Sequence, residues 1–283
     1  MIGMTCLDLT ARAIRWQRLL APVGHVPYGR TLQYLLIGYL ANNVLPARLG
    51  ELVRCHYLGD REGLSRATTL GTVVVERVVD TAVVVSIAAL AIVVLQVRGL
   101  VANAVLFGLA VTALLVVILA ILVAAQRLPG AERIATTAER WPRVADAARK
   151  LHGGLAVAGR PRTLAEALVF SGLAWSATVV AFAAAGQAVG VQLTTAQAAL
   201  LASGVALATA IPSGPGNLGT FDLAATAIAS TFGLDRERAV ALAIVSHATV
   251  LVVTSVGGGA ALLRLGWRPR PPAPISEAEP DPG

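Results

Sequence analysis

Three charged residues, Glu76, Arg77 and Asp80, lie within five positions of an apolar stretch long enough to enter a membrane. Each charge at bilayer depth costs about 2.5–3.5 kcal/mol on insertion scales, so such side chains pair with one another or face a wet cavity. On a helix, Glu76 and Asp80 share a face at i and i+4, and Arg77 reaches Asp80 at i+3. Two interpretations are open: the group lines a polar pathway, or it lies at headgroup level at one end of a helix.

A second pair of charges, Glu51 and Arg54, follows a break in another apolar stretch. Pro46 removes a backbone donor, and Gly50 adopts dihedral angles that other residues avoid. A helix should therefore end near Asn43, and the next should begin just before Gly50. Glu51 and Arg54 then lie on one helix face, close enough to pair. This pair either lines the same pathway or belongs to a surface helix, and Asn43 either caps the broken backbone or contacts a ligand.

A glycine-rich turn at Pro212–Gly219 interrupts a later apolar stretch and is followed by Asp222. The turn lacks the Gly-Lys-Ser/Thr ending of a nucleotide-binding loop. We interpret it as exposed backbone amides that face an anionic group such as phosphate, with Asp222 as the charged partner.

His247 lies in the last apolar stretch, where we expect it to hydrogen-bond a neighbour. The candidate pathway residues are Asn43, Arg48, Glu51, Arg54, Glu76, Arg77, Asp80, Asn217, Asp222 and His247, and the structural breaks are Pro46, Gly50, Pro212, Gly216 and Gly219.

The composition is that of an integral membrane protein. Hydrophobic residues make up 56% and charged residues 14% of the chain, and the mean hydropathy is +0.71, whereas soluble domains are about a quarter charged. The net charge of +7 resides in the segments between apolar runs, where it reports orientation and not nucleic-acid binding. The two cysteines give no disulfide framework, and no metal-ligand or catalytic spacing appears. We therefore expect no metal, no cofactor and no enzymatic activity.

The apolar runs lack the alternation of outer-membrane barrels and predict an all-α integral membrane protein, a polytopic helical bundle. Two apolar segments, 31–45 and 197–211, are shorter than the roughly 20 residues that cross a bilayer core. Each is followed by a break and a short helix, which indicates a broken, re-entrant hairpin. The helices predicted to cross the membrane are 67–97, 101–125, 164–189 and 238–265.

We divide the chain into three parts. Residues 1–30 form an amphipathic N-terminal segment, whose helix at 5–20 we expect to lie on the membrane surface. Residues 31–265 form the transmembrane domain, and residues 266–283 form a disordered tail. Within the domain, the polar segment 126–163 carries eight basic and three acidic residues. Its net charge of +5 predicts a cytoplasmic loop.

The charge distribution favours re-entrant hairpins over full crossings. If residues 31–45 crossed the bilayer, the spans that follow would place the basic segment 126–163 outside. A hairpin that enters and leaves on the cytoplasmic side places that segment inside, as the positive-inside rule requires. Residues 197–231 then enter from the opposite face, and the C-terminus is cytoplasmic. Such opposed hairpins form an inverted repeat, from which many transporters build a midplane site. The alternative is two additional full crossings, whose effects on the orientation of the later segments cancel.

Four motifs occur in order between residues 10 and 265. They are Arg12–Leu20, Asn43-x2-Pro46-x-Arg48-Leu49-Gly50-Glu51-x2-Arg54, Glu76-Arg77-x2-Asp80 and Pro212-x2-Pro215-Gly216-x2-Gly219. Together they resemble the lysylphosphatidylglycerol synthase transmembrane-domain family, the flippase-like membrane domain. The resemblance implies an α-helical domain that, in members with a synthase domain, moves the aminoacylated phospholipid between leaflets. No synthase domain follows the motifs, so lipid synthesis is not implied.

We therefore predict a flippase-like lipid translocase in a bacterial cell membrane, with membrane lipids as its partners. Its cargo would be a phospholipid or another lipid-linked headgroup. The alternative is a non-transporting accessory or anchor for an envelope enzyme that modifies lipids or glycans, such as a glycosyltransferase. A membrane-embedded transferase is a third class, and the absence of a nucleophile or metal motif weighs against it. We expect no nucleic-acid partner.

Overall fold

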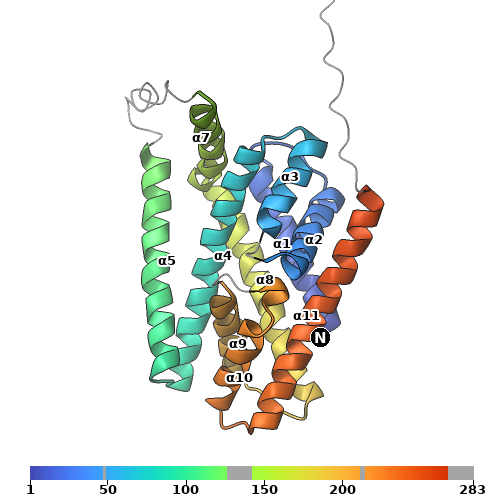
Figure 1. Cartoon of the computed structure of the whole chain (residues 1–283). Helices are drawn as coiled ribbons and strands as arrows, with labels where there is room; N and C mark the ends of the chain where they lie inside the picture. The colour runs from blue at the N-terminus through green and yellow to red at the C-terminus, as the bar shows by residue number, and fades with distance from the viewer. Residues whose placement is uncertain (47–48, 126–141, 211–213, 267–283) are drawn as a thin grey trace, which may run out of the picture.

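The computed structural model describes residues 1–46, 49–125, 142–210 and 214–266. Within these residues the fold is entirely helical, and most helices run along a common axis (Figure 1). Four of the described helices, α4, α5, α8 and α11, are long and apolar enough to cross a membrane. The predicted polytopic helical fold is thus confirmed. The elements are α1 (Ile2–Leu20), α2 (Tyr28–Val44), α3 (Gly50–Glu62), α4 (Arg66–Leu95), α5 (Leu100–Ala125), α7 (Pro142–Leu155), η3 (Ala156–Gly159), α8 (Pro161–Ala188), α9 (Thr195–Thr209), η4 (Pro215–Asn217), α10 (Thr220–Ser230) and α11 (Arg236–Leu265).

Several helix boundaries follow from capping residues. At the start of α9, the Thr194 hydroxyl accepts from the backbone N–H of Gln197, whose side chain accepts from the N–H of Thr194. Asp235 begins α11 by accepting from the N–H of Arg238 at 2.8 Å. Gly63 ends α3 with a φ of +69°, a conformation that glycine adopts without steric cost. Each N-terminal cap stabilises its helix by roughly 0.5–2 kcal/mol.

The first broken hairpin consists of α2 and α3, which pack against each other. Leu45 ends α2 in an extended conformation, with φ −94° and ψ 144°, as the following proline dictates. A Cβ on Gly50 would run into the carbonyl oxygen of Gly38, so the two helices approach more closely than a side chain permits. The Oδ1 of Asn42 accepts from the N–H of Gly50 at 2.7 Å and caps α3. The predicted break before Gly50 is therefore confirmed.

The second broken hairpin consists of α9 and α10, joined through the η4 turn. Gly216 and Gly219 have φ values of +62° and +83°, which side chains other than glycine rarely adopt. The carboxylate of Asp222 accepts from the N–H of Gly219 at 3.3 Å and closes the first turn of α10. The predicted partnership of Asp222 with the turn is confirmed, whereas Pro212 lies outside the described residues.

The two hairpins point toward each other from opposite ends of the bundle. In Figure 1, α2 and α3 occupy the upper half, and α9 and α10 occupy the lower half. Their tips touch, because a Cβ on Gly216 would lie 3.6 Å from the carbonyl oxygen of Asn43. The four helices have 17, 13, 15 and 11 residues, each short of the roughly 20 that cross a bilayer core. The arrangement agrees with the predicted inverted pair.

The N-terminal helix α1 differs from the sequence-based expectation. It packs lengthwise against α8 and also contacts α2 and α4 inside the bundle. Arg15 and Trp16 are 0% exposed, and Arg12 is 7% exposed. The prediction of a surface-lying helix is therefore wrong. Arg12 and Arg15 are buried against carboxylates of α4, which periodicity alone does not reveal.

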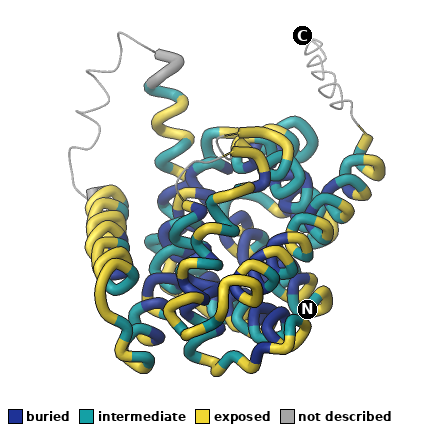
Figure 2. Tube along the Cα trace, turned by 60° about the horizontal axis from the view of Figure 1, so that its bottom comes forward, coloured by how far each residue is buried: buried dark blue, intermediate teal, exposed yellow. Residues whose placement is uncertain are grey.

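The periphery of the bundle is formed by α5 and α7. Figure 2 shows α5 as an exposed helix beside the bundle, while buried positions gather in the interior. Exposed apolar side chains such as Leu106, Phe107 and Leu114 cover this helix, as on a helix that contacts lipid. Within the predicted polar segment, α7 packs on α4, where a Cβ on Gly71 would lie 2.8 Å from the Cα of Gly154. The remainder of that loop, 126–141, and the predicted disordered tail from 267 lie outside the described residues.

Candidate functional site

Asp80 on α4 is the centre of a buried network of charges. Its Oδ1 accepts from Nη1 of Arg15 at 2.5 Å and from Nε1 of Trp175 at 2.9 Å, and its Oδ2 accepts from Nη1 of Arg12 at 3.1 Å. Asp8, one turn before Arg12 on α1, accepts from the Nε of Arg12 at 2.7 Å. Charge-assisted hydrogen bonds of this kind are about twice as strong as neutral ones. They hold α1 and α8 to α4.

Glu76 extends this network by one helical turn. Its Oε1 accepts from Nη2 of Arg15 at 2.8 Å, and its Oε2 accepts from Nη2 of Arg54 at 2.9 Å. The Arg54 guanidinium also lies over the ring of Trp16, 4.4 Å from its centroid, in a cation–π contact. The predicted pairing of Glu51 with Arg54 is therefore wrong. Arg54 turns inward because it helps to neutralise the buried carboxylate of Glu76, which Arg15 and Arg77 also contact.

The buried network contains as many positive as negative charges. None of its six side chains is more than 14% exposed. Removing one partner from a buried pair costs about 3–5 kcal/mol, because the other charge is left without compensation. The network therefore holds α1, α3 and α4 together and leaves no surplus charge. Its members are Arg12, Arg15, Arg54, Asp8, Glu76 and Asp80.

Glu51 and Arg77 form a looser pair at the edge of this network. The Nη2 of Arg77 lies 3.9 Å from Oε1 of Glu51 and 3.4 Å from Oε1 of Glu76. The side chain of Arg77 is 38% exposed and that of Glu51 is 21% exposed. The predicted contact of Arg77 with Asp80 is wrong, because Arg12 and Arg15 occupy the oxygens of Asp80. Arg77 and Glu51 are thus the charges best placed to change partners.

A second, smaller cluster surrounds His247 on α11. Its Nε2 lies 2.8 Å from the carbonyl oxygen of Gly216, and its Nδ1 lies 3.1 Å from Oδ1 of Asp222. The imidazole stacks on Phe221, with ring centroids 4.2 Å apart. The prediction that His247 hydrogen-bonds a neighbour is confirmed. The histidine joins α11 to both the η4 turn and the start of α10.

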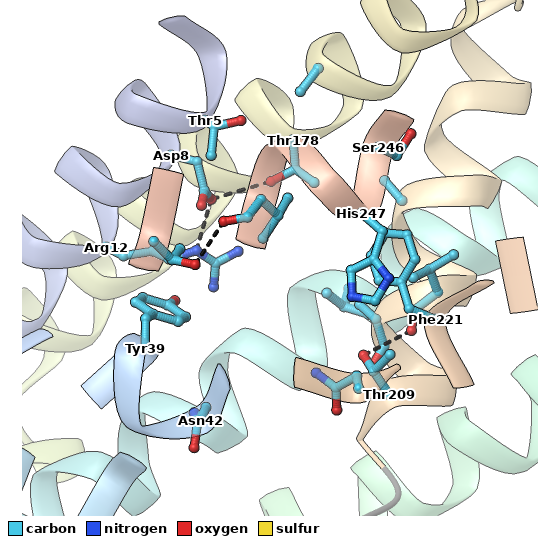
Figure 3. Close-up of a pocket in the computed structure, with 18 of the residues that line it drawn as sticks. Thr5, Asp8, Arg12, Tyr39, Asn42, Thr178, Thr209, Phe221, Ser246 and His247 are labelled. Atoms are coloured by element: carbon cyan, nitrogen blue, oxygen red, sulfur yellow. Dashed lines mark hydrogen bonds and ion pairs between the residues drawn. The ribbon is translucent and has the colours of Figure 1, made fainter. Parts of the chain in front are cut away.

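A cavity of about 570 Å³ lies between these two clusters. Figure 3 shows Asp8 and Arg12 on one side of it and His247 and Phe221 on the other. The hydroxyl of Ser246, on this cavity wall, is buried and has no hydrogen-bond partner within the part of the chain that the structure describes. An unsatisfied buried hydroxyl costs about 1–3 kcal/mol, so this position favours a polar occupant.

Six of the predicted pathway residues line this cavity. Arg54 and Glu76 lie behind its wall in the buried network, and Asp222 supports His247 from behind. Arg48 lies outside the described residues. The six lining residues are Asn43, Glu51, Arg77, Asp80, Asn217 and His247.

Asn43 has a structural contact that the sequence did not indicate. Its Nδ2 donates to the hydroxyls of Thr254 and Ser255 at 2.8 and 3.0 Å. The end of α2 is thereby fastened to α11. Farther along α11, a Cβ on Gly258 would lie 2.5 Å from the Cβ of Leu40. The absence of a side chain at Gly258 thus allows α2 and α11 to approach closely.

Sequence reasoning missed several residues of the site. Asp8 and Thr178 line the cavity, and Arg12 and Trp175 both line it and hold Asp80. One signal was available, the i, i+4 spacing of Asp8 and Arg12 on a helix that is otherwise largely apolar. The partners of these side chains lie 68 to 170 residues away along the chain. Pattern along one helix does not identify contacts of that separation.

The described residues contain no group of three or more histidine, cysteine, aspartate or glutamate side chains that could hold a metal ion. The two cysteines are free; Cys6 is exposed and Cys55 is buried. The polar groups of the cavity are thus arginines, carboxylates, amides, hydroxyls and one imidazole. Such groups bind charged or hydrogen-bonding headgroups directly.

Comparison with known proteins gives one match. The family model of the lysylphosphatidylglycerol synthase TM region matches residues 1–258, a range that includes both broken hairpins and the buried network. No curated protein and no solved structure matches the chain. The match agrees with the resemblance of the four motifs and with the four apolar helices of a membrane protein. The chain therefore belongs to the lysylphosphatidylglycerol synthase transmembrane-region family, membrane domains related to lipid handling.

Proposed function

We propose that this protein is a lipid translocase of the cell membrane, which moves a phospholipid or another lipid-linked headgroup between leaflets without altering it. The observation that carries the proposal is the cavity at the touching tips of two opposed broken hairpins. Irregular backbone at membrane depth is tolerated where it lines a cavity, and transporters place their substrate sites at such breaks.

The charges on the cavity wall support a headgroup as the cargo. Arg77 is partly exposed and held loosely, so its guanidinium is available to a phosphate, which it binds in a bidentate fashion. Glu51 beside it is available to a cationic group on the same headgroup. Apolar side chains such as Val84 and Val205 line the same space. A lipid, which combines a charged headgroup with apolar chains, matches both parts of this lining.

A leaflet-sidedness assay tests the proposal. The protein is reconstituted in vesicles that contain a phospholipid with a fluorescent headgroup, and the fraction protected from an external quencher is followed over time. We expect Arg77→Gln and Glu51→Gln each to slow the exchange about tenfold, the loss of one charge-assisted hydrogen bond. Arg162→Gln, whose side chain is 91% exposed on α8, is the matched control and should exchange lipid at the wild-type rate.

Two outcomes would overturn the proposal. Wild-type rates in both variants would exclude the cavity as the route. A wild-type protein that moves no lipid, but co-purifies with a lipid- or glycan-modifying enzyme, would favour the competing function of a membrane accessory.

A further inference from the structure

The imidazole of His247 has a hydrogen-bond acceptor at each ring nitrogen. Nε2 lies 2.8 Å from the carbonyl oxygen of Gly216, and Nδ1 lies 3.1 and 3.2 Å from the two carboxylate oxygens of Asp222. A carbonyl and an ionised carboxylate only accept hydrogen bonds, and a neutral imidazole has a single N–H to donate. Both contacts are satisfied only when the Asp222–His247 pair carries one proton more than a neutral histidine beside an ionised aspartate.

With this extra proton, His247 on α11 is hydrogen-bonded to both Gly216 and Asp222 of the second hairpin. His247 is 5% exposed, and its ring is stacked on Phe221 at an interplanar angle of 11°, so its two ring nitrogens depend on protein groups as their hydrogen-bond partners. If the proton passes to water in the cavity, no bond between heavy atoms changes. One of the two acceptors then loses its donor, which costs about 1–3 kcal/mol when the acceptor is buried. The contact of Gly216 or of Asp222 with α11 is lost.

The same turn forms the contact between the two hairpins. Gly216 packs against Asn43, and both residues line the cavity. We propose that Asp222 and His247 form a proton-binding site that holds the hairpin tips closed when protonated and releases them when the proton leaves. The inference rests on the proposed function, since it couples the movement of lipid through the cavity to a proton gradient.

The surroundings of His247 contain few other titratable groups. On α10 the facing charge is Asp222, and the side chain of Met1, which meets Thr249 of α11, lies on the same cavity wall. Among the described cavity-lining residues, those of α8, α9 and η4 have no titratable side chain, and α2 contributes the phenol of Tyr39. The remaining charges on the wall are Asp8, Arg12, Glu51, Arg77 and Asp80.

Cysteine accessibility tests the site without any transport measurement. Leu251 contacts Gly216 from α11, because a Cβ on Gly216 would lie 3.2 Å from its side chain. We would label Leu251→Cys in a protein lacking its two native cysteines, and divide its rate by that of Leu263→Cys, an exposed position on the same helix. The ratio cancels the effect of pH on the thiol itself.

The expected ratio rises about tenfold between about pH 5.5 and about pH 8, the range in which histidine ordinarily changes charge. His247→Gln should make the ratio independent of pH, whereas His25→Gln, an exposed histidine outside the cavity, should leave the rise intact. Asp222→Asn should keep the ratio low at both pH values, because its amide donates to Nδ1 and leaves the ring N–H for Gly216. A rise that persists in His247→Gln would overturn the proton site.

A transport measurement separates this inference from the proposed function. In vesicles with an imposed proton gradient, wild type and His25→Gln should exchange lipid about tenfold faster than without a gradient, and His247→Gln should not respond. Lipid exchange that ignores the gradient in wild type overturns the proton site and leaves the translocase intact. Labelling that depends on pH in a protein that moves no lipid supports the proton site and overturns the translocase.

Discussion

The two sides of the cavity hold their charges in opposite ways. On the side of α1 and α4, three arginines and three carboxylates are buried together, and Asp80 alone receives three hydrogen bonds. On the side of α11, one imidazole and one partly exposed carboxylate hold a turn of backbone. The first side changes its charge only at a large cost, because every member has a partner of opposite sign. The second changes its state with a single proton.

The same contrast separates the two hairpin tips. The tip of the first hairpin is fixed by the amides of Asn42 and Asn43, which bond Gly50 and two hydroxyls of α11. Neither amide titrates. The tip of the second is fixed by His247 and Asp222, the proposed proton-binding site. The attachment of the first tip is thus independent of protonation, whereas the attachment of the second depends on the proposed proton-binding site.

The largest expected effect is in the buried network. Asp80→Asn removes the charge that faces Arg12 and Arg15, so the free energy of unfolding in detergent micelles should fall by about 3–5 kcal/mol. Asp146→Asn is the control, since this carboxylate on α7 is 49% exposed and paired only with Lys150 among the described residues. Equal unfolding free energies for the two variants would show that the network does not hold the bundle together.

A smaller effect is expected where the first hairpin meets α11. Gly258→Ala forces its new methyl group against Leu40 and should lower the unfolding free energy by about 1–3 kcal/mol, the usual cost of overpacking. Gly259→Ala meets no atom within 4 Å and should stabilise the helix slightly, as alanine does in place of glycine. If both variants had the same stability, the close packing of α2 on α11 would be disproved.

The smallest effect concerns the cap of α3. Asn42→Ala removes the bond to the N–H of Gly50 and should cost about 1 kcal/mol, measured by the same unfolding experiment. Because an amide does not titrate, this loss should be equal at low and neutral pH, in contrast to the loss in His247→Gln. Asn103→Ala, at an exposed position of α5, serves as the control. A pH-dependent loss in Asn42→Ala would remove the difference between the two tips.

Much of the fold is predictable from local signals. Apolar length identified the four spanning helices, and Pro46, Gly50 and the glycine-rich turn marked both breaks, because proline and glycine restrict or free the backbone wherever they occur. The excess of basic residues between 126 and 163 favoured hairpins over crossings. These properties depend on composition and on neighbours in the chain, so a sequence carries them directly.

The partners of the charges were not predictable. Glu51 and Arg54 share a helix face, and pairing them followed from spacing alone. Arg54 instead pairs with Glu76, whose carboxylate is fully buried and needs compensating charge, whereas Glu51 lies at the cavity. The burial of α1 was not predicted for the same reason. Arg12 and Arg15 are buried because they contact Asp80 on α4. The sequence of α1 does not show that this carboxylate lies opposite.

The central claim is that lipid passes between the two hairpin tips, and a cross-link across them tests it most directly. Asn43→Cys with Gly216→Cys places two thiols where a Cβ on Gly216 would lie 3.9 Å from the Cα of Asn43, within reach of a disulfide. Each single cysteine is the control for the oxidant, in a protein without native cysteines. We predict lipid exchange in the reduced double variant and none after oxidation. Equal exchange before and after a completed cross-link would contradict the account.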